Sequence, residues 1–132
     1  MTPLAPASPY MALAASPFMT SIDSIDSGLM AFSGSLKRHR RLDPRLVELV
    51  RLRVAFHNQC RSCMAMRYST GLDDGLTEDL VCSLEQPHEA SDLTEAEKAA
   101  LAYADVSALN HFAIDDGVFE GLRLHYSEAE IV

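Results

Sequence analysis

The sequence predicts an all-α fold. Apolar residues recur at helical spacing in several segments, and residues that favour helix ends stand at the borders of those segments. No segment alternates apolar and polar residues over a convincing length, as a half-buried strand would. The chain has 132 residues, 48% of them hydrophobic, which suits one domain with a single core.

The chain divides into an N-terminal arm over residues 1–35 and a helical domain over residues 36–132. The arm is rich in Pro, Ala and Ser, and prolines resist regular structure. Ser and Asp in "SIDSIDSGLMAF" can cap a helix within the arm, which we expect to stop at Gly34. The basic stretch 37–41, "KRHRR", is interpreted as a solvated segment leading into the next helix.

The first strong helix is predicted over residues 43–57. Asp43 suits the N-cap, and Pro44 suits the first helical position. Apolar residues form a broad face, which we expect to be buried. Asn58 and Gln59 should end the helix, because Asn competes for backbone hydrogen bonds.

A second helix is predicted from Cys60 to Tyr68, with Gly71 as its stop. Three further helix starts are marked by N-cap residues: Thr77, Thr94 in a capping box with Glu97, and Asp115 or Asp116. The last residues open with another capping box, Ser127 to Glu130, and the chain ends almost at once. We therefore expect the domain to be truncated at its C-terminus.

Net charge is −8, but the two halves differ. Residues 1–67 carry nine basic and four acidic residues, and residues 68–132 carry two and fifteen. An acidic protein is repelled by phosphates, so we expect no nucleic-acid partner. No apolar run approaches the roughly 18 residues of a membrane span, so no membrane partner is expected either. The apolar N-terminus lacks the positive region of a secretory signal, which favours a cytoplasmic location.

Three cysteines are too few, and an odd number, for a secreted disulfide scaffold. Two of them, Cys60 and Cys63, form a CxxC motif in "HNQCRSCMAMR". In a reducing compartment such a motif is more often catalytic or metal-binding than structural. Redox chemistry, half of a metal site and inert packing all remain open from the motif alone. Cys82 stands by itself on an apolar segment, and we expect it in the core.

Redox chemistry needs a thiolate, and the unpaired N–H groups of a helix start stabilise one. Arg67 lies four residues after Cys63, on the same helical face, and its charge would favour the thiolate of Cys63. The metal alternative is a zinc site made of His57, Cys60 and Cys63 with Cys82 or His88. Its spacing is irregular and no second CxxC is present.

The segment "ELVRLRVAFHNQCRSCMAMR" resembles the signature of the alkylhydroperoxidase-D-like branch of the carboxymuconolactone decarboxylase family. That signature is a Glu on a helix, eleven intervening residues, and a CxxC that opens the next helix, and Glu48 and Cys60 fit it. Later segments resemble the family's following helices, so the resemblance covers roughly residues 42–132. It implies a helical bundle that assembles as a homo-oligomer, a trimer or a hexamer.

The resemblance also implies a thiol-dependent antioxidant protein that reduces hydroperoxides, or a similar small-molecule substrate, through a dithiol/disulfide cycle. An external thiol reductant would restore the dithiol, and no cofactor or metal is implied. Family members use a proton relay of Glu and histidines. Glu48, Cys60 and Cys63 carry over. Ser62 and Arg67 stand where the family often has histidines, so the relay is altered.

We therefore expect Cys63 to attack beside Arg67, Cys60 to resolve, and Glu48 to act as a base. His57 could supply a missing base, or could simply pack or cap the end of its helix. Glu48 could instead form surface pairs with Arg45 and Arg51. Two other functions remain open: a catalytically weakened, oligomeric ligand-binding protein, and a lactone decarboxylase, against which the CxxC argues.

Overall fold

The computed structural model describes residues 17–132, with side chains from residue 25 onward. The chain forms two compact units, residues 1–40 and 41–132. The described residues contain helices and no strand, which confirms the all-α prediction. The first 16 residues of the predicted arm lie outside the described part of the chain.

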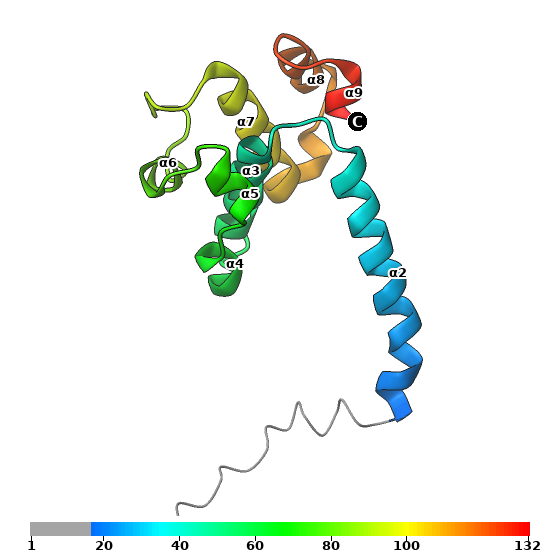
Figure 1. The fold of residues 1–132 in the computed structure, drawn as a ribbon. Helices are drawn as coiled ribbons and strands as arrows, with labels where there is room; N and C mark the ends of the chain where they lie inside the picture. The colour runs from blue at the N-terminus through cyan, green and yellow to red at the C-terminus, as the bar shows by residue number, and fades with distance from the viewer. Residues whose placement is uncertain (1–16) are drawn as a thin grey trace, which may run out of the picture. The chain divides into compact units, whose positions relative to one another are not determined.

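The described part of the first unit is a long helix, α2, over Pro17–His39 (Figure 1). The predicted stop at Gly34 is wrong, because the helix runs through it for five more residues. Its last turn carries Lys37, Arg38 and His39, whose side chains suit the negative end of the helix dipole. The basic stretch therefore belongs mainly to α2.

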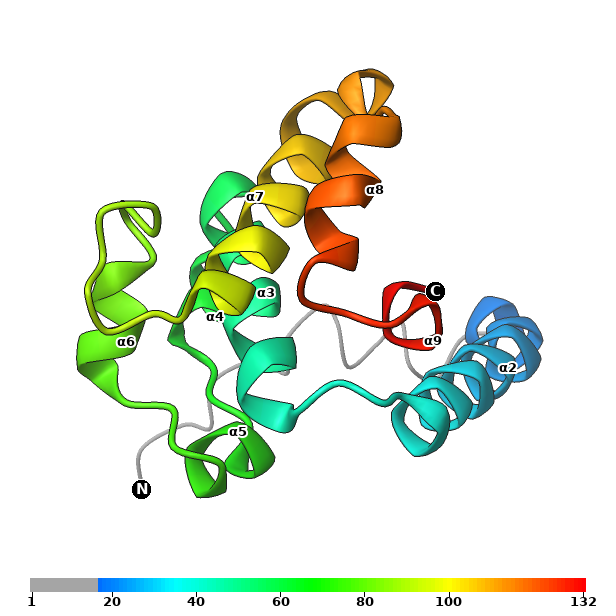
Figure 2. The same ribbon diagram turned by 90° about the horizontal axis from the view of Figure 1, so that it is seen from above.

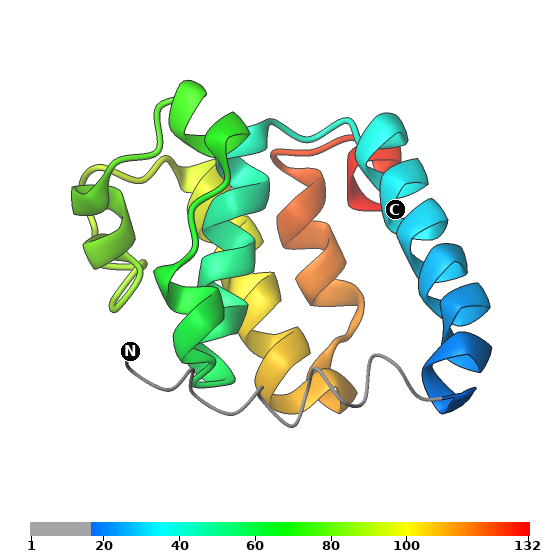
Figure 3. The same ribbon diagram turned by 60° about the horizontal axis from the view of Figure 1, so that its bottom comes forward.

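The second unit is built around two helices that pack against each other, α3 (Pro44–His57) and α7 (Glu95–Asn110). Figure 3 shows α3 and α7 side by side, with α8 next to α7. The short helices α4 and α5 pack on α3, and α9 packs on α8. The remaining bounds are α4 Arg61–Ala65, α5 Ser69–Asp73, α6 Glu78–Ser83, η1 His111–Ala113, α8 Asp116–Arg123 and α9 Glu128–Ile131.

Leucines of α3 and α7, with residues of and around α6, make the core of the second unit. Leu49, Leu52, Leu84 and Leu101 are fully buried. The other buried members of the cluster are Leu76, Leu80, Val81 and Leu93. Figure 2 shows α3 and α7 in contact from a second direction, with α6 beside them. The core thus packs against one face of α3, which matters because the CxxC follows directly after this helix.

Several helix starts follow the predicted signals, but the start of α3 departs from them. The capping boxes of Thr94 with Glu97 and of Ser127 with Glu130 are both present. The Asp43 side chain makes no capping hydrogen bond at the start of α3. Instead the Arg45 amide donates to the carboxylate of Asp74, 2.9 Å away. Asp74, which follows α5, therefore provides the capping hydrogen bond that the sequence analysis expected from Asp43.

The helix predicted from Cys60 to Tyr68 is shorter than expected. It is α4, which ends at Ala65, and Met66 at its C-cap already has an extended backbone. Gly71 does not stop this helix but lies buried within α5. A Cβ on Gly71 would come within 2.9 Å of the Glu48 Cβ, so glycine allows α5 to approach α3 closely.

The other predicted starts are confirmed. Thr77 caps α6 through the Leu80 amide, and Asp115 caps α8 through the Val118 amide. Across the described helices, none combines the length and apolar character that a bilayer crossing requires.

Candidate redox site

A tight turn joins α3 to the CxxC. The Gln59 amide donates to the Phe56 carbonyl, and the Cys60 amide donates to the Ala55 carbonyl. Gln59 has a φ of 50°, in the left-handed region. These are the features of a Schellman motif, which closes a helix by satisfying its last carbonyls. The predicted break at residues 58 and 59 is confirmed, and it places Cys60 directly at the end of α3.

Cys60 and Cys63 form a disulfide, with their Cα atoms 5.3 Å apart. Cys60 is the N-cap of α4, and its sulfur accepts a hydrogen bond from the Cys63 amide at 3.4 Å. The Ser62 hydroxyl lies 3.6 Å from the same sulfur. Both cysteines are half-buried.

Glu48 lies beneath this segment, and it is buried, with a side chain only 3% exposed. Both of its carboxylate oxygens accept hydrogen bonds from the Arg51 guanidinium, each at 2.7 Å. The Tyr68 amide donates to Glu48 as well, at 3.0 Å. The predicted pairing with Arg51 is therefore present, but it is buried and not a surface pair.

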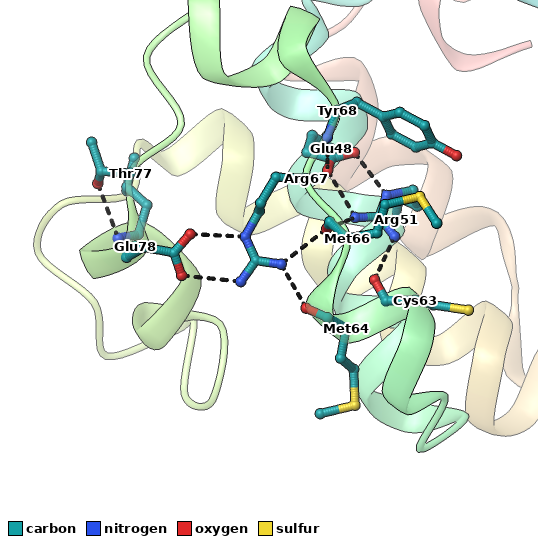
Figure 4. A network of polar contacts seen from close by, with 10 residues as sticks. Glu48, Arg51, Cys63, Met64, Met66, Arg67, Tyr68, Thr77 and Glu78 are labelled. Carbon is teal, nitrogen blue, oxygen red and sulfur yellow. Dashed lines mark hydrogen bonds and ion pairs between the residues drawn. The ribbon is translucent and has the colours of Figure 1, made fainter. Parts of the chain in front are cut away.

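Arg51 connects this ion pair to the CxxC segment. Its guanidinium donates to the carbonyls of Cys63 and Met66, both at 2.8 Å. It also lies over the Tyr68 ring, 5.1 Å from the centroid, in a cation–π arrangement. Figure 4 shows the network, in which the carbonyl of Cys63, and not its sulfur, faces Arg51.

The environment keeps Glu48 ionised. Burial disfavours the charged form. The hydrogen bonds from Arg51 and the Tyr68 amide, with the charges of Arg51 and Arg67, outweigh burial and hold the pKa of Glu48 below its usual value. A carboxylate whose pKa lies far below neutrality is a weak general base. The geometry of Glu48 thus suits a structural anchor better than a proton relay.

Arg67 makes its own ion pair and hydrogen bonds on the other side of the CxxC segment. Its guanidinium pairs with both carboxylate oxygens of Glu78 and donates to the carbonyls of Met64 and Met66. Figure 4 shows the Cys63 sulfur directed away from Arg67. Two arginines therefore satisfy the carbonyls at the C-terminal end of α4, which a helix leaves without intrahelical partners. These contacts compensate for the end of the helix before Met66.

Sequence comparison now decides the family. The model of the family described as "Carboxymuconolactone decarboxylase family" matches residues 25–106. This chain belongs to the carboxymuconolactone decarboxylase family. The structure and the comparison agree, since the matched residues span the second half of α2 and the helices α3 to α6 with most of α7.

Two curated relatives come from Mycobacterium tuberculosis. They are the uncharacterized protein MT2376 of strain CDC 1551 / Oshkosh and the uncharacterized protein Rv2313c of strain ATCC 25618 / H37Rv. Each is 38% identical over 103 residues, which is 76% of this chain and 36% of the relative. The chain thus matches little more than a third of the length of these relatives.

His57 lies on a different face of α3 from the family's glutamate. Glu48 and His57 are nine residues apart, about two and a half turns, and so point in opposite directions. The His57 Nε2 atom is 2.6 Å from Asp105 of α7. Arg53 also pairs with Asp105 and donates to the Leu84 carbonyl. His57 is thus held by α7, on the side of α3 away from Glu48.

The prediction that Cys82 is a core residue is wrong. Cys82 is exposed, because the buried face of α6 consists of Leu80 and Val81, with Leu84 just after it. A disulfide also occupies both CxxC sulfurs. Within the described part of the chain, no group of three or more His, Cys, Asp or Glu side chains converges on a metal position. The zinc ligand set proposed from the sequence is therefore not assembled.

Sequence reasoning missed three residues of this family site: Arg51 as a bridge to backbone carbonyls, Tyr68 as the donor to Glu48, and Glu78 as the partner of Arg67. The signal for Arg51 was present, because Glu48 and Arg51 are three apart on one helix. Burial of that pair depends on how α4 and α5 fold back onto α3. This packing cannot be predicted from the residues of α3 alone.

Proposed function

We propose that the Cys60–Cys63 pair reduces hydroperoxides through a dithiol/disulfide cycle. The observation that most strongly supports this proposal is a disulfide between two half-buried cysteines three residues apart at the start of α4. Family membership supports the proposal, because the chain keeps the CxxC and the glutamate that precedes it by twelve positions. The backbone around both cysteines is held by two arginines.

The cycle balances in three steps. A thiolate attacks the terminal peroxide oxygen, the O–O bond breaks, a sulfenic acid forms, and the leaving alkoxide takes a proton from water to become an alcohol. The second thiol then condenses with the sulfenic acid, which releases water and forms the disulfide. An external dithiol finally reduces that disulfide by exchange and is itself oxidised.

Hydrogen bonding favours Cys60 as the attacking residue, the reverse of the order that the sequence suggested. The Cys63 amide donates to the Cys60 sulfur, and the Ser62 hydroxyl lies beside it. Donors of this kind stabilise a thiolate and lower the pKa of a thiol. Arg67, the expected stabiliser of Cys63, is engaged with Glu78 and two carbonyls.

Glu48 acts in this proposal as a positioning residue. It fixes Arg51, and Arg51 fixes the carbonyls of Cys63 and Met66. Glu48→Gln should therefore weaken folding without shifting the pH at which Cys60 becomes reactive. An altered pH profile of Cys60 alkylation by iodoacetamide would instead make Glu48 part of the proton transfer.

The decisive experiment is a peroxidase assay with hydrogen peroxide and tert-butyl hydroperoxide, using dithiothreitol as the donor. Cys60→Ser should abolish turnover. In a separate reaction without dithiothreitol, which reduces sulfenic acids itself, Cys63→Ser should consume one equivalent of peroxide and accumulate a Cys60 sulfenic acid that dimedone traps. Cys82→Ser is the matched control and should keep full activity, because Cys82 lies outside the site. Activity that survives both Cys60→Ser and Cys63→Ser would remove this chemistry from the CxxC.

A second candidate, binding of a small apolar ligand, rests on a separate cavity. A cavity of about 170 Å³ lies among α3, α7, α8 and α9, away from the cysteines. Its wall includes Leu46, Val50, Tyr103, Leu122, Tyr126 and Ile131. If the CxxC variants and the parent show no peroxidase activity, yet an apolar ligand raises their melting temperatures equally, this candidate replaces the first.

A further inference from the structure

Helix α2 carries a narrow stripe of large apolar side chains. The stripe consists of Ile25, Leu29, Phe32 and Leu36, which are spaced four, three and four residues apart. At 3.6 residues per turn these four positions fall within a sector of about 60°. All four side chains are more than half exposed. An alternating three–four spacing is the pattern of a coiled-coil seam, which is narrower than the apolar face of a helix that packs on a globular core.

Charges are unevenly distributed along the same helix. From residue 25 onward, Asp26 is the only acidic side chain of α2, and it lies near the middle of the helix. The last turn holds Lys37, Arg38 and His39, and Arg40 and Arg41 follow it directly. Two parallel copies of α2 would place these basic ends side by side, where they repel each other. Two antiparallel copies bring Asp26 of each toward the basic end of the other and also oppose the helix dipoles.

We propose that α2 pairs with α2 of a second copy of this chain, in the antiparallel direction, along this stripe. The register that uses all four residues sets Ile25 of one copy opposite Leu36 of the partner subunit, and Leu29 opposite Phe32 of the partner subunit. The seam then extends over twelve residues, about 17 Å of helix. Such pairing has two-fold symmetry, so it generates assemblies with an even number of chains.

The first test is the mass of the full chain in solution, measured by sedimentation velocity and by light scattering. We expect an even-numbered assembly in the parent. Leu29→Glu with Phe32→Glu should halve its mass, because two charges then stand in the seam. Ala31→Glu is the matched control, since Ala31 is exposed on the opposite side of α2, and it should leave the mass unchanged. Circular dichroism should show that the variants keep their helices.

Two results overturn the proposal. One is a parent chain that stays monomeric, which would assign the stripe to a contact within the chain. The other is an assembly whose mass is the same in the parent and in the Leu29→Glu/Phe32→Glu variant, which would place the interface elsewhere.

The second test determines direction, in a Cys82→Ser background with the native disulfide oxidised. Ile25→Cys and Leu36→Cys variants are prepared separately and then mixed under mild oxidation. Antiparallel pairing predicts that the mixture cross-links between the two variants far more than either variant cross-links with itself. Preferential cross-linking of each variant with itself would show parallel pairing and would overturn the charge argument.

Discussion

On two opposite faces of α3, an arginine links a carboxylate to backbone carbonyls, and each arginine holds a different segment against the helix. On one face Arg51 joins the carboxylate of Glu48 to the carbonyls of Cys63 and Met66. On the opposite face Arg53 joins the carboxylate of Asp105 to the carbonyl of Leu84. The first cluster fixes the CxxC segment, and the second fixes α7 and the chain after α6.

The two clusters differ in burial and in sequence distance. The Glu48 side chain is 3% exposed, whereas the Asp105 side chain is 27% exposed. Glu48 finds its arginine three residues away, and Asp105 finds one 52 residues away. Removal of a partner costs more where water cannot replace it. The CxxC segment is thus anchored by the more deeply buried of the two ion pairs, and by the one whose partners are closer in sequence.

The largest expected effect comes from breaking the deeper cluster. Arg51→Ala leaves the buried carboxylate of Glu48 without a counter-ion, so unfolding free energy should fall by about 3 kcal/mol. Urea unfolding of the oxidised protein measures this. The double variant Glu48→Leu/Arg51→Met should recover much of the loss, because it buries no unpaired charge. A loss under about 1 kcal/mol, as for an exposed pair, would contradict the role of burial.

An intermediate loss of stability is expected from a substitution in α5, where this helix contacts Glu48. Gly71→Ala places a Cβ 2.9 Å from the Glu48 Cβ, so the two helices must move apart. We expect a loss of about 2 kcal/mol, typical of overpacking. Gly121→Ala is the matched control: a Cβ there meets nothing within 4 Å, and alanine favours a helix, so α8 should gain slightly. Equal thermal melting shifts in the two variants would refute the close approach.

The smallest loss of stability is expected in the less buried cluster of Asp105, Arg53 and His57, and this loss depends on pH. Burial opposes ionisation of Asp105, but hydrogen bonds from Arg53 and His57 outweigh it and lower its pKa. A lowered folded pKa gives stability that is present above the unfolded value of about 3.9 and is lost as pH falls through the folded value.

Asp105→Asn should therefore cost about 1 kcal/mol at neutral pH, and the gap to the parent should close as pH falls below about 4. Thermal melts between neutral pH and acid measure that gap. A gap that stays constant with pH would show that the ionisation of Asp105 adds no stability.

Local signals predicted much of this fold. The capping boxes at Thr94 and Ser127 and the break after His57 follow from residue types close together in sequence. The CxxC and the glutamate before it also identified the family segment. These features succeed because each depends on the backbone within one or two turns.

Features that depend on distant residues were missed. Asp74 caps α3 from a later loop, and Asp105 reaches the end of α3 from α7. Cys82 was assigned to the core because its segment is apolar, but its neighbours Leu80 and Val81 take the buried positions of α6. A short helix has room for one buried face, and only tertiary packing decides which residues lie on it.

Cys60 connects the end of α3 to the start of α4 through its backbone hydrogen bonds. Its amide closes α3 through the Ala55 carbonyl, while its carbonyl accepts from the Met64 amide and so begins α4. The main chain at this residue is therefore held by hydrogen bonds to α3 and to α4. In the proposed cycle, the sulfur that gains and loses electrons is thus attached to the backbone corner that both helices stabilise.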